Sequence, residues 1–341
     1  MRRTSAHLRY LVPHATCLMP ASMIHLLFTG GTISMRRDEA AGGNVPVLDG
    51  EALVRLVPGL PAVSPFRIED WGRFPACHLG PEDLWRLRER VRAIQTGPDR
   101  PQGIVITHGT DTIEETAYLL ARTLDPQVPV TITGAMRTSS DAEWDGPRNL
   151  TDAARVAADP GSAGRGAMVV FCGKILAGLE AAKTHATDPD AFEAPHAGPI
   201  GRVEGERVAW SGSRGAPADV LRPPALTARV ALVPMVIGDR GELLDLVRPT
   251  HDGVVIVAFG SGNLPPGALP AIRRWLGEGK PVILATRCLY DQVTPVYAFP
   301  GGGATLVREG LIPAGPRTPA QASMELVIAL SAGRPYGRTE D

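Results

Sequence analysis

Two short segments of the chain combine threonine hydroxyl groups with glycine, at residues 29–34 and 107–112. In the first segment Thr32 follows two glycines, which let the backbone turn sharply and approach a ligand closely. A threonine hydroxyl becomes an effective nucleophile only where a base or an ordered hydrogen-bond network takes its proton. The chemistry that these residue types allow is nucleophilic catalysis, although the first segment alone is also typical of a tight turn.

The second segment places Thr110 and Asp111 at the expected start of a helix. Thr112 and Glu115 match the spacing of a capping box, and Asp111 suits the positive end of the helix dipole, so capping alone can explain these residues. The same helix start presents free backbone N–H groups beside the Thr110 hydroxyl. Such groups can stabilise an oxyanion.

A hydroxyl nucleophile or relay needs a base, and Lys183 is one candidate in a lysine-poor sequence. A buried lysine can have its pKa lowered towards neutrality, whereas a carboxylate such as Asp111 opposes that shift. His108 and His185 are competing bases, and for each of them a structural role is the simpler interpretation.

Two further loops follow apolar runs, at residues 133–137 and 260–263. In the first, backbone groups near Gly134 and Ala135 can meet a substrate amide. The second lies in the C-terminal part of the chain and can reach the site from a partner subunit. Both loops are also compatible with simple turns.

The elements that must position these loops are short apolar strands. Residues 24–28 and 103–107 precede the two threonine segments and have the composition of strands buried on both faces of a parallel sheet. Ligands bind beyond the carboxyl ends of such strands, so both segments are expected at one site. Further strands are expected at residues 128–133, 167–172, 229–233, 253–259 and 281–285, and helices at residues 84–94, 113–124, 150–158, 270–276 and 319–330.

This alternation of strands and helices predicts an α/β protein with two domains. We expect an N-terminal arm at residues 1–22, which is disordered or precedes a natural start at Met23. A catalytic domain at residues 23–210 and a linker at residues 211–228, rich in glycine, serine and proline, follow it. A smaller domain covers residues 229–341. Residues 34–50 are polar and contain glycine, which fits either a lid or a plain surface loop.

The composition restricts the class of partner. The 341 residues are 44% hydrophobic and 21% charged, with a formal net charge of -1. This balance provides no electrostatic basis for binding nucleic acid or an anionic membrane, so small molecules or further copies of the chain are the expected partners. Four widely spaced cysteines form no metal-binding or disulfide pattern, which favours a reduced, cytoplasmic protein without a metal: Cys17, Cys77, Cys172 and Cys288.

The motifs taken together resemble a known family. Residues 29–33 and 107–117 resemble the two signature patterns of bacterial-type L-asparaginases and glutaminase-asparaginases. The resemblance continues in order from about residue 24 to residue 332, through residues 133–137, 145–150, 183–184 and 260–263. It implies a larger N-terminal domain with a flavodoxin-like parallel sheet and a smaller C-terminal α/β domain. It also implies a homodimer or homotetramer with active sites between subunits.

The resemblance implies a role for each matched residue. Thr32 would be the acylated nucleophile. Thr110, Lys183 and Asp111 would form a second set, in which Lys183 tunes Thr110, Thr110 helps to order the attacking water, and Asp111 binds the substrate α-ammonium group. The backbone of Thr110 and Ala135 would stabilise the oxyanion. No metal or organic cofactor is implied.

The sequence departs from the family pattern around the substrate. Where many members have a serine that binds the substrate carboxylate, this chain has Cys77 and His78, and one of them must perform that task. Asn263 would approach from the neighbouring subunit. The acidic residue that some secreted members contribute across the interface has no counterpart near residues 301–303.

A third departure concerns the nucleophile. Residues 34–50 contain no tyrosine, although the family's mobile loop usually supplies one as a partner of the nucleophile, and Val45 stands near its expected position. Tyr290 and Tyr297 are the candidates to replace it. What activates Thr32 is therefore left open by the sequence.

The leading hypothesis is an amidohydrolase that converts L-asparagine and water to L-aspartate and ammonia, with glutaminase activity as an extension. The alternative from another class is a catalytically weak sensor or pseudoenzyme that binds an amino acid. A third hypothesis is the amidotransferase subunit that supplies ammonia for tRNA-dependent amidation. That subunit carries an additional N-terminal domain, for which the segment before Ile24 is expected to be too short.

Overall fold

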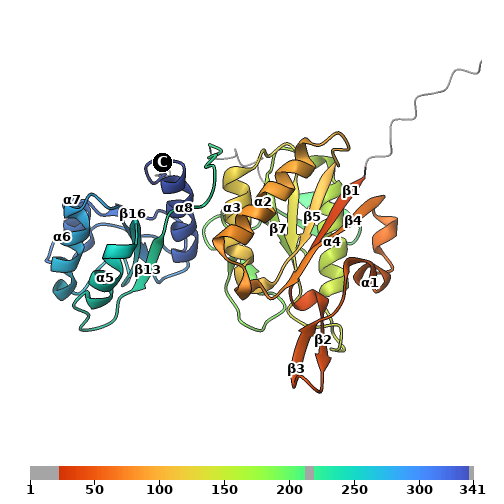
Figure 1. Cartoon of the computed structure of the whole chain (residues 1–341), viewed down its shortest axis with the longest axis horizontal. Helices are drawn as coiled ribbons and strands as arrows, with labels where there is room; N and C mark the ends of the chain where they lie inside the picture. The colour runs from red at the N-terminus through yellow and green to blue at the C-terminus, as the bar shows by residue number, and fades with distance from the viewer. Residues whose placement is uncertain (1–22, 212–218, 338–341) are drawn as a thin grey trace, which may run out of the picture.

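The chain forms two α/β domains that are joined through a pair of packed helices (Figure 1). The computed structural model describes residues 23–211 and 219–337. No helix within these two ranges is long and apolar enough to cross a membrane.

The N-terminal domain is built on an eight-stranded sheet with the order β12-β11-β8-β7-β6-β5-β1-β4. Five neighbouring strands, β4, β1, β5, β6 and β7, are parallel. They follow the flavodoxin-like order, in which the first strand in the sequence lies between the second and the third. Strands β8, β11 and β12 continue the sheet in antiparallel fashion. The bounds are β1 Ile24–Gly30, β4 Phe66–Phe74, β5 Gly103–Thr107, β6 Val130–Thr133, β7 Ala167–Phe171, β8 Lys174–Ala177, β11 Gly201–Glu204 and β12 Arg207–Trp210.

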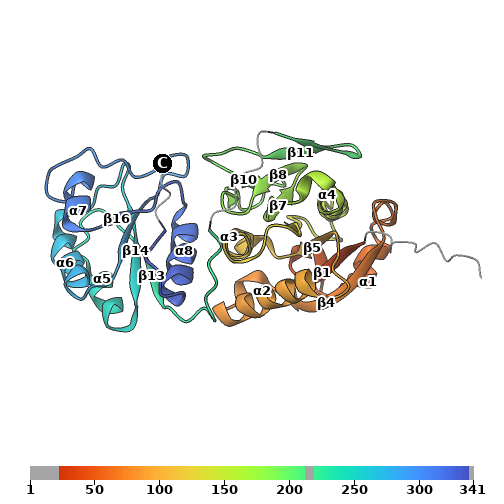
Figure 2. The same ribbon diagram turned by 90° about the horizontal axis from the view of Figure 1, so that it is seen from above.

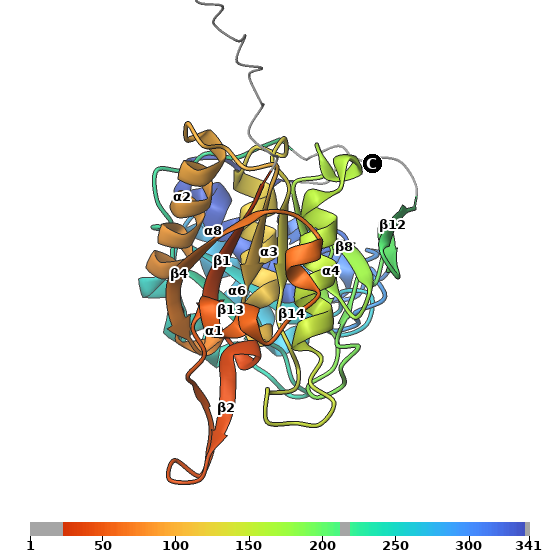
Figure 3. The ribbon, with the colours of Figure 1, turned by 90° about the vertical axis from the view of Figure 1, so that its right-hand side faces the viewer.

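Helices cover both faces of this sheet. Helices α2 (Pro81–Thr96) and α3 (Ile113–Thr123) pack on one face, and α1 (Gly50–Arg55) and α4 (Gly146–Ala158) pack on the other; Figures 2 and 3 show α2 and α4 on opposite sides of β1. Successive side chains of a strand point to opposite faces, so both faces of the central strands must be apolar. This explains why the strand sequences are continuously hydrophobic.

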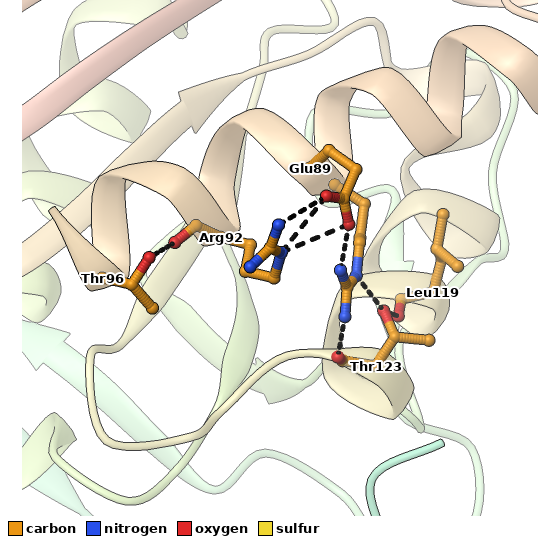
Figure 4. Close-up of polar contacts among 6 residues, drawn as sticks. Glu89, Arg92, Thr96, Leu119 and Thr123 are labelled. Atoms are coloured by element: carbon orange, nitrogen blue, oxygen red, sulfur yellow. Dashed lines mark hydrogen bonds and ion pairs between the residues drawn. The ribbon is translucent and has the colours of Figure 1, made fainter. Parts of the chain in front are cut away.

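Helices α2 and α3 are joined by Arg88, which is only 5% exposed. Its Nε and Nη2 atoms donate to the side chain and the carbonyl oxygen of Thr123 at the end of α3, over 3.2 and 2.6 Å. The guanidinium group also forms an ion pair with Glu89. The Glu89 carboxylate forms a second ion pair with Arg92, whose side chain is exposed (Figure 4). The seam between the two helices is therefore closed by satisfied polar groups, as burial of a charge requires.

The C-terminal domain contains a four-stranded parallel sheet with the order β13-β14-β15-β16. Figure 2 shows α5, α6 and α7 on one side of this sheet, and α8 on the other side, facing α3 of the N-terminal domain. The bounds are β13 Val230–Pro234, α5 Glu242–Val247, β14 Gly253–Ala258, α6 Leu269–Gly277, β15 Val282–Thr286, α7 Gly303–Glu309, β16 Ile312–Pro313 and α8 Pro319–Ser331.

The contact between α3 and α8 contains a buried charge cluster. The Glu325 side chain on α8 is completely buried and accepts hydrogen bonds from Arg122 Nε over 2.9 Å and from the Tyr118 hydroxyl over 3.0 Å. Tyr118 accepts in turn from Arg317 Nε over 2.7 Å. Breaking such a cluster leaves an uncompensated charge in the interior.

Replacing Glu325 with glutamine is therefore expected to lower the free energy of unfolding by about 3 kcal/mol, because Arg122 loses its buried countercharge. Urea unfolding followed by circular dichroism measures this loss. Glu309→Gln is the matched control, because it breaks a more exposed pair with Arg273, and about 1 kcal/mol or less is expected there. Equal losses in the two variants would contradict the prediction.

The expected strands and helices are confirmed, with ends that differ by a few residues. The sequence interpretation missed β4 and the antiparallel strands β8, β11 and β12. It left residues 34–50 as a lid or loop, where the structure forms a hairpin of β2 (Met35–Asp38) and β3 (Gly43–Pro46). The division into domains at residues 211–228 stays a prediction, and residues 1–22 and 212–218 lie outside the described part of the chain.

Candidate active site

The two threonine segments meet at the carboxyl ends of β1 and β5, which are neighbours in the sheet. This is the point at which the strand order of a doubly wound sheet reverses, and the diverging loops leave room for a ligand there. The first segment continues into the short 3-10 turn η1 (Thr32–Ser34), and the second into η4 (Thr110–Thr112), which leads directly into α3. The fold therefore places Thr32 and Thr110 at one edge of the sheet.

Glycine contacts set the distance between these loops. Gly31 has a φ of +83°, and a Cβ atom at this position would lie 2.4 Å from the Cα atom of Gly109. A Cβ atom on Gly109 would in turn lie 2.7 Å from the Cβ atom of Ala76. The Thr29 hydroxyl donates to the carbonyl oxygen of Thr107 over 2.7 Å and joins the strand ends. Three loops thus pack backbone against backbone around the site.

Lys183 connects the second threonine segment to a distant part of the chain. It lies on the two-residue strand β9 (Ala182–Lys183), and its Nζ atom donates to Thr110 Oγ1 and to Asp111 Oδ1, in each case over 2.9 Å. The Thr110 residue is buried, with 5% exposure, whereas the Asp111 side chain is 65% exposed. A buried hydroxyl therefore contacts an ammonium group whose carboxylate partner faces solvent.

The two competing bases lie in other environments. His108 is fully buried; burial lowers its pKa, so the ring is neutral near neutral pH. Its Nδ1 atom lies 2.9 Å from the carbonyl oxygen of Gly109, which only accepts, so we assign the proton to Nδ1 and let Nε2 accept from Thr116. His185 is exposed and contacts Thr184. Both ring nitrogens of His108 are therefore used in hydrogen bonds that stabilise the loop.

The capping box predicted for Thr112 and Glu115 does not form. Thr112 occupies the N-cap position of α3, but its side chain makes no capping hydrogen bond. Its hydroxyl instead donates to the carbonyl oxygen of Ala76 over 3.4 Å. The expected local bond is replaced by a bond to the neighbouring turn η3 (Ala76–His78), which the sequence spacing could not reveal.

Cys77 and His78 lie on this turn η3, which packs against the second threonine segment. Both side chains are exposed to solvent, and Cys77 is a free thiol. The structure thus brings them to the same edge of the sheet as Thr110. That one of the two contacts a substrate carboxylate stays a prediction.

Ala135 belongs to a loop after β6 that is held by two polar side chains. Asp145 accepts from the backbone N–H groups of Met136 and Arg137, and Asn149 donates to the carbonyl oxygen of Gly134. Ala135 is fully buried, and within residues 23–211 and 219–337 its N–H has no hydrogen-bond partner. A buried donor without a partner is rare in proteins and fits a place that a ligand oxygen occupies.

Thr32 itself is half-buried, and its hydroxyl group has no hydrogen-bond partner in the described ranges. Val45 lies in the β2–β3 hairpin and pairs with Arg36 in the ladder. The Tyr290 hydroxyl donates to Glu193, and Tyr297 packs beside Phe299. Neither tyrosine forms a hydrogen bond with Thr32 in this structure.

Asn263 lies in the C-terminal domain, where it pairs with Phe259 just after β14. Its Oδ1 atom accepts from the backbone N–H of Gly303 over 3.2 Å. No hydrogen bond joins it to the N-terminal loops in the described part of this chain. A role in this protomer's own site is therefore not supported.

Comparison with known proteins assigns the chain to a family. The family model described as "Asparaginase, N-terminal" matches residues 23–214, and the "Glutaminase/Asparaginase C-terminal domain" matches residues 229–340. The chain belongs to the asparaginase family. A solved structure, described as a probable cytoplasmic L-asparaginase from Campylobacter jejuni, is similar to most of the chain. Its TM-score is 0.78 and its identity 27%, and the match covers 91% of this chain and 95% of that one.

Two curated relatives match most of this chain. A probable L-asparaginase from Deinococcus radiodurans is 39% identical over 92% of this chain and 95% of its own length. A subunit of a glutamyl-tRNA(Gln) amidotransferase from Pyrococcus furiosus is 30% identical over 90% of this chain and 72% of its own length. The two-domain asparaginase fold expected from the sequence is confirmed.

Sequence reasoning passed over one residue in this asparaginase-family site. Glu114 lies in the first turn of α3, and its carboxylate accepts from the backbone N–H of Lys183 over 3.3 Å and from the Thr318 hydroxyl. These partners lie 69 and 204 positions away in the sequence. The family signature contained Glu114, but no local pattern indicated what it contacts.

Proposed function

We propose that this chain hydrolyses the side-chain amide of L-asparagine to L-aspartate and ammonia. The observation that carries the proposal is the hydrogen-bonded set of Lys183, Thr110 and Asp111, held against the Thr32 loop by the contact between Gly31 and Gly109. Membership of the asparaginase family supports the same reaction class. Glutaminase activity is proposed as a secondary activity, because L-glutamine differs from L-asparagine by one methylene group.

In the first half-reaction the Thr32 hydroxyl oxygen attacks the amide carbon. The hydroxyl proton passes to the departing nitrogen, the C–N bond breaks, and ammonia leaves an acyl ester on Thr32. The developing oxyanion accepts hydrogen bonds from the N–H groups of Thr110, at the start of η4, and of Ala135. Donors fixed in this way stabilise the tetrahedral intermediate more than the substrate.

In the second half-reaction water replaces ammonia. Because Lys183 donates to the Thr110 oxygen, the Thr110 hydroxyl group can donate a hydrogen bond that holds a water molecule beside the ester. The exposed Asp111 carboxylate has its Oδ1 atom on Lys183 and offers Oδ2 to the substrate α-ammonium group. The water oxygen attacks the ester carbon, and the bond between that carbon and the Thr32 oxygen breaks. One water proton passes to the Thr32 oxygen, so L-aspartate is released and the Thr32 hydroxyl is regenerated.

Substrate binding and assembly complete the proposal. Cys77 or His78 on η3 binds the α-carboxylate, and Asn263 of a neighbouring subunit closes the site in a homodimer or homotetramer. Exposed apolar side chains on the C-terminal domain, including Ile237 at 96% and Leu246 at 73% exposure, are consistent with a face that a second copy covers. A cytoplasmic location is proposed with it, in line with the description of the Campylobacter relative.

The direct test is ammonia release from L-asparagine, with L-glutamine and D-asparagine assayed beside it under identical conditions. We expect turnover of L-asparagine, the proposed substrate, to exceed that of L-glutamine, and a difference of one methylene group is typically worth about 1 to 3 kcal/mol. Light scattering on the same preparation measures the oligomeric state. Absence of ammonia release with all three amides would overturn the proposal.

Replacing Gly31 with alanine tests the contact between the loops. The new Cβ atom would collide with backbone atoms of Gly109, and the resulting displacement of Thr32 is expected to lower kcat/KM about a hundredfold. Gly42→Ala is the matched control, since Gly42 also has a positive φ, of +68°, but open space around it. We expect Gly42→Ala to change thermal stability slightly and activity little. Equal effects of both substitutions would show that backbone strain alone matters.

A further inference from the structure

The strand that carries Lys183 is too short to fix the residue by itself. Strand β9 contains two residues and, among the described strands, pairs only with the equally short β10 (Phe192–Glu193). The additional support for Lys183 comes from the segment that also carries its side-chain partners. Thr110 and Asp111 bind the Nζ atom, and Glu114, at the first turn of α3, accepts from the backbone N–H over 3.3 Å. The lysine is therefore held at both ends by residues 110–114.

Helix α8 of the C-terminal domain holds the other side of this arrangement. The Thr318 hydroxyl caps α8 by accepting from the N–H of Gln321, and it donates its own proton to Oε1 of Glu114. The side chain of Gln321 donates to the carbonyl oxygen of Ala181 over 3.1 Å, two residues before Lys183. The N-terminal turn of α8 thus contacts both Glu114 and the backbone leading into β9.

We propose that Glu114 is a positioning residue, which holds Lys183 against Thr110 and Asp111 and makes that geometry depend on the docking of α8. The consequence for catalysis rests on the proposed function, because it requires that Lys183 acts in the reaction. The geometric part does not require it.

The environment of Glu114 argues against a role in stability alone. The pKa of Glu114 is raised to about 7, mainly by burial and to a smaller extent by the neighbouring carboxylate of Glu115 on the same helix. The facing groups from other elements are the hydroxyl of Thr318 and the N–H of Lys183, which donate to it and lower its pKa. Glu114 therefore lies where burial disfavours its ionised form. One of its carboxylate oxygens accepts from Lys183 on β9 and the other from Thr318 at the start of α8, so the residue connects two segments that must be aligned.

The first arm of the test reads the position of Lys183 without any substrate. The sequence contains three lysines, Lys174, Lys183 and Lys280, so competitive acetylation with limiting acetic anhydride followed by mass spectrometry resolves each ε-amine. Lys280 lies in the C-terminal domain beside Glu278 and provides the internal reference. We expect Glu114→Leu to raise the labelling rate of Lys183 relative to Lys280 at least threefold, and Glu114→Gln, which keeps a carbonyl acceptor, to stay within twofold of wild type.

The second arm reads kcat and KM for L-asparagine. We expect Glu114→Leu to lower kcat at least tenfold with KM changed less than threefold, and Glu114→Gln to restore most of kcat. Thr318→Val should lower kcat less than Glu114→Leu, and Thr318→Ser should resemble wild type because it keeps the hydroxyl. Tyr118→Phe is the structural control, since it weakens the same pair of helices one turn along α3 without touching Glu114, and its kcat should match wild type.

The outcomes separate this inference from the proposed function. If wild type releases no ammonia but Glu114→Leu exposes Lys183 to labelling, the proposed function fails and the positioning role stands. If wild type is active and Glu114→Leu changes neither the labelling ratio nor kcat, the inference is overturned. It is also overturned if Tyr118→Phe lowers kcat and exposes Lys183 as much as Glu114→Leu does, because any loosening of α8 would then suffice.

Discussion

Replacement of Thr32 by alanine is expected to abolish ammonia release from L-asparagine while the folded protein still binds the amino acid. Thr32 is the proposed nucleophile, and loss of a nucleophile typically lowers kcat by at least about 10⁴-fold. Thr32 is half-buried in η1, and its hydroxyl has no partner in the described part of the chain, so removing it breaks no structural hydrogen bond. A coupled ammonia assay measures the first effect, and the shift of the melting temperature with added L-aspartate measures the second.

Thr32→Ser is the matched control, because it retains the hydroxyl group and removes only a methyl group. We expect Thr32→Ser to keep measurable activity. If wild type and Thr32→Ala are equally silent while the ligand still raises the melting temperature, the hydrolase proposal fails. The chain would then be an amino-acid-binding sensor, an interpretation that the absence of a tyrosine from residues 34–50 also favours.

Replacement of Lys183 by methionine is expected to lower kcat about a thousandfold, in the range typical of a lost proton-transfer or hydrogen-bonding group. Methionine fills a similar volume, but it cannot donate to Thr110 or pair with Asp111, both of which lie 2.9 Å from the lysine nitrogen. The exposed Asp111 keeps its access to the substrate, so KM should change much less than kcat. Steady-state kinetics with L-asparagine separates the two constants.

Lys174→Met is the matched control for this substitution. Lys174 is also partly buried and ion-paired, with Asp190 over 2.7 Å, but it lies on β8 and contacts neither Thr110 nor Asp111. We expect its kcat to stay within about threefold of wild type. A large loss in Lys174→Met, or an unchanged kcat in Lys183→Met, would contradict the role assigned to Lys183.

The central strands could be predicted because their surroundings leave a clear pattern in the sequence. Strands β1 and β5 are covered by helices on both faces, so nearly every residue is apolar or small. Strand β4 lies at the edge of the sheet and contains charged residues such as Arg67 and Asp70, so it resembles a loop. Strand β4 is defined by its hydrogen bonds to β1 and not by a recognisable pattern in its own sequence.

The site was predictable where a motif is local and unpredictable where it depends on long-range contacts. Thr110, Asp111 and Lys183 were recognised together because a family signature links them. The capping box of Thr112 and Glu115 was a reasonable local expectation, yet η3 offers Thr112 a carbonyl oxygen that only the folded chain brings near. The contact between Glu114 and Thr318 spans 204 positions, so neither residue carries a local sign of the other.

The position of α8 in the sequence affects the order in which the contacts around Lys183 can form during synthesis. Lys183, Thr110 and Asp111 precede Thr318 and Gln321 in the chain, so they are synthesised before the residues that contact Glu114 and Ala181. Domains fold largely in the order of their synthesis, so the N-terminal sheet forms before α8 exists. Until α8 has been synthesised, Glu114 and Ala181 lack their partners on that helix, so Lys183 is expected to be held less firmly in the incomplete chain.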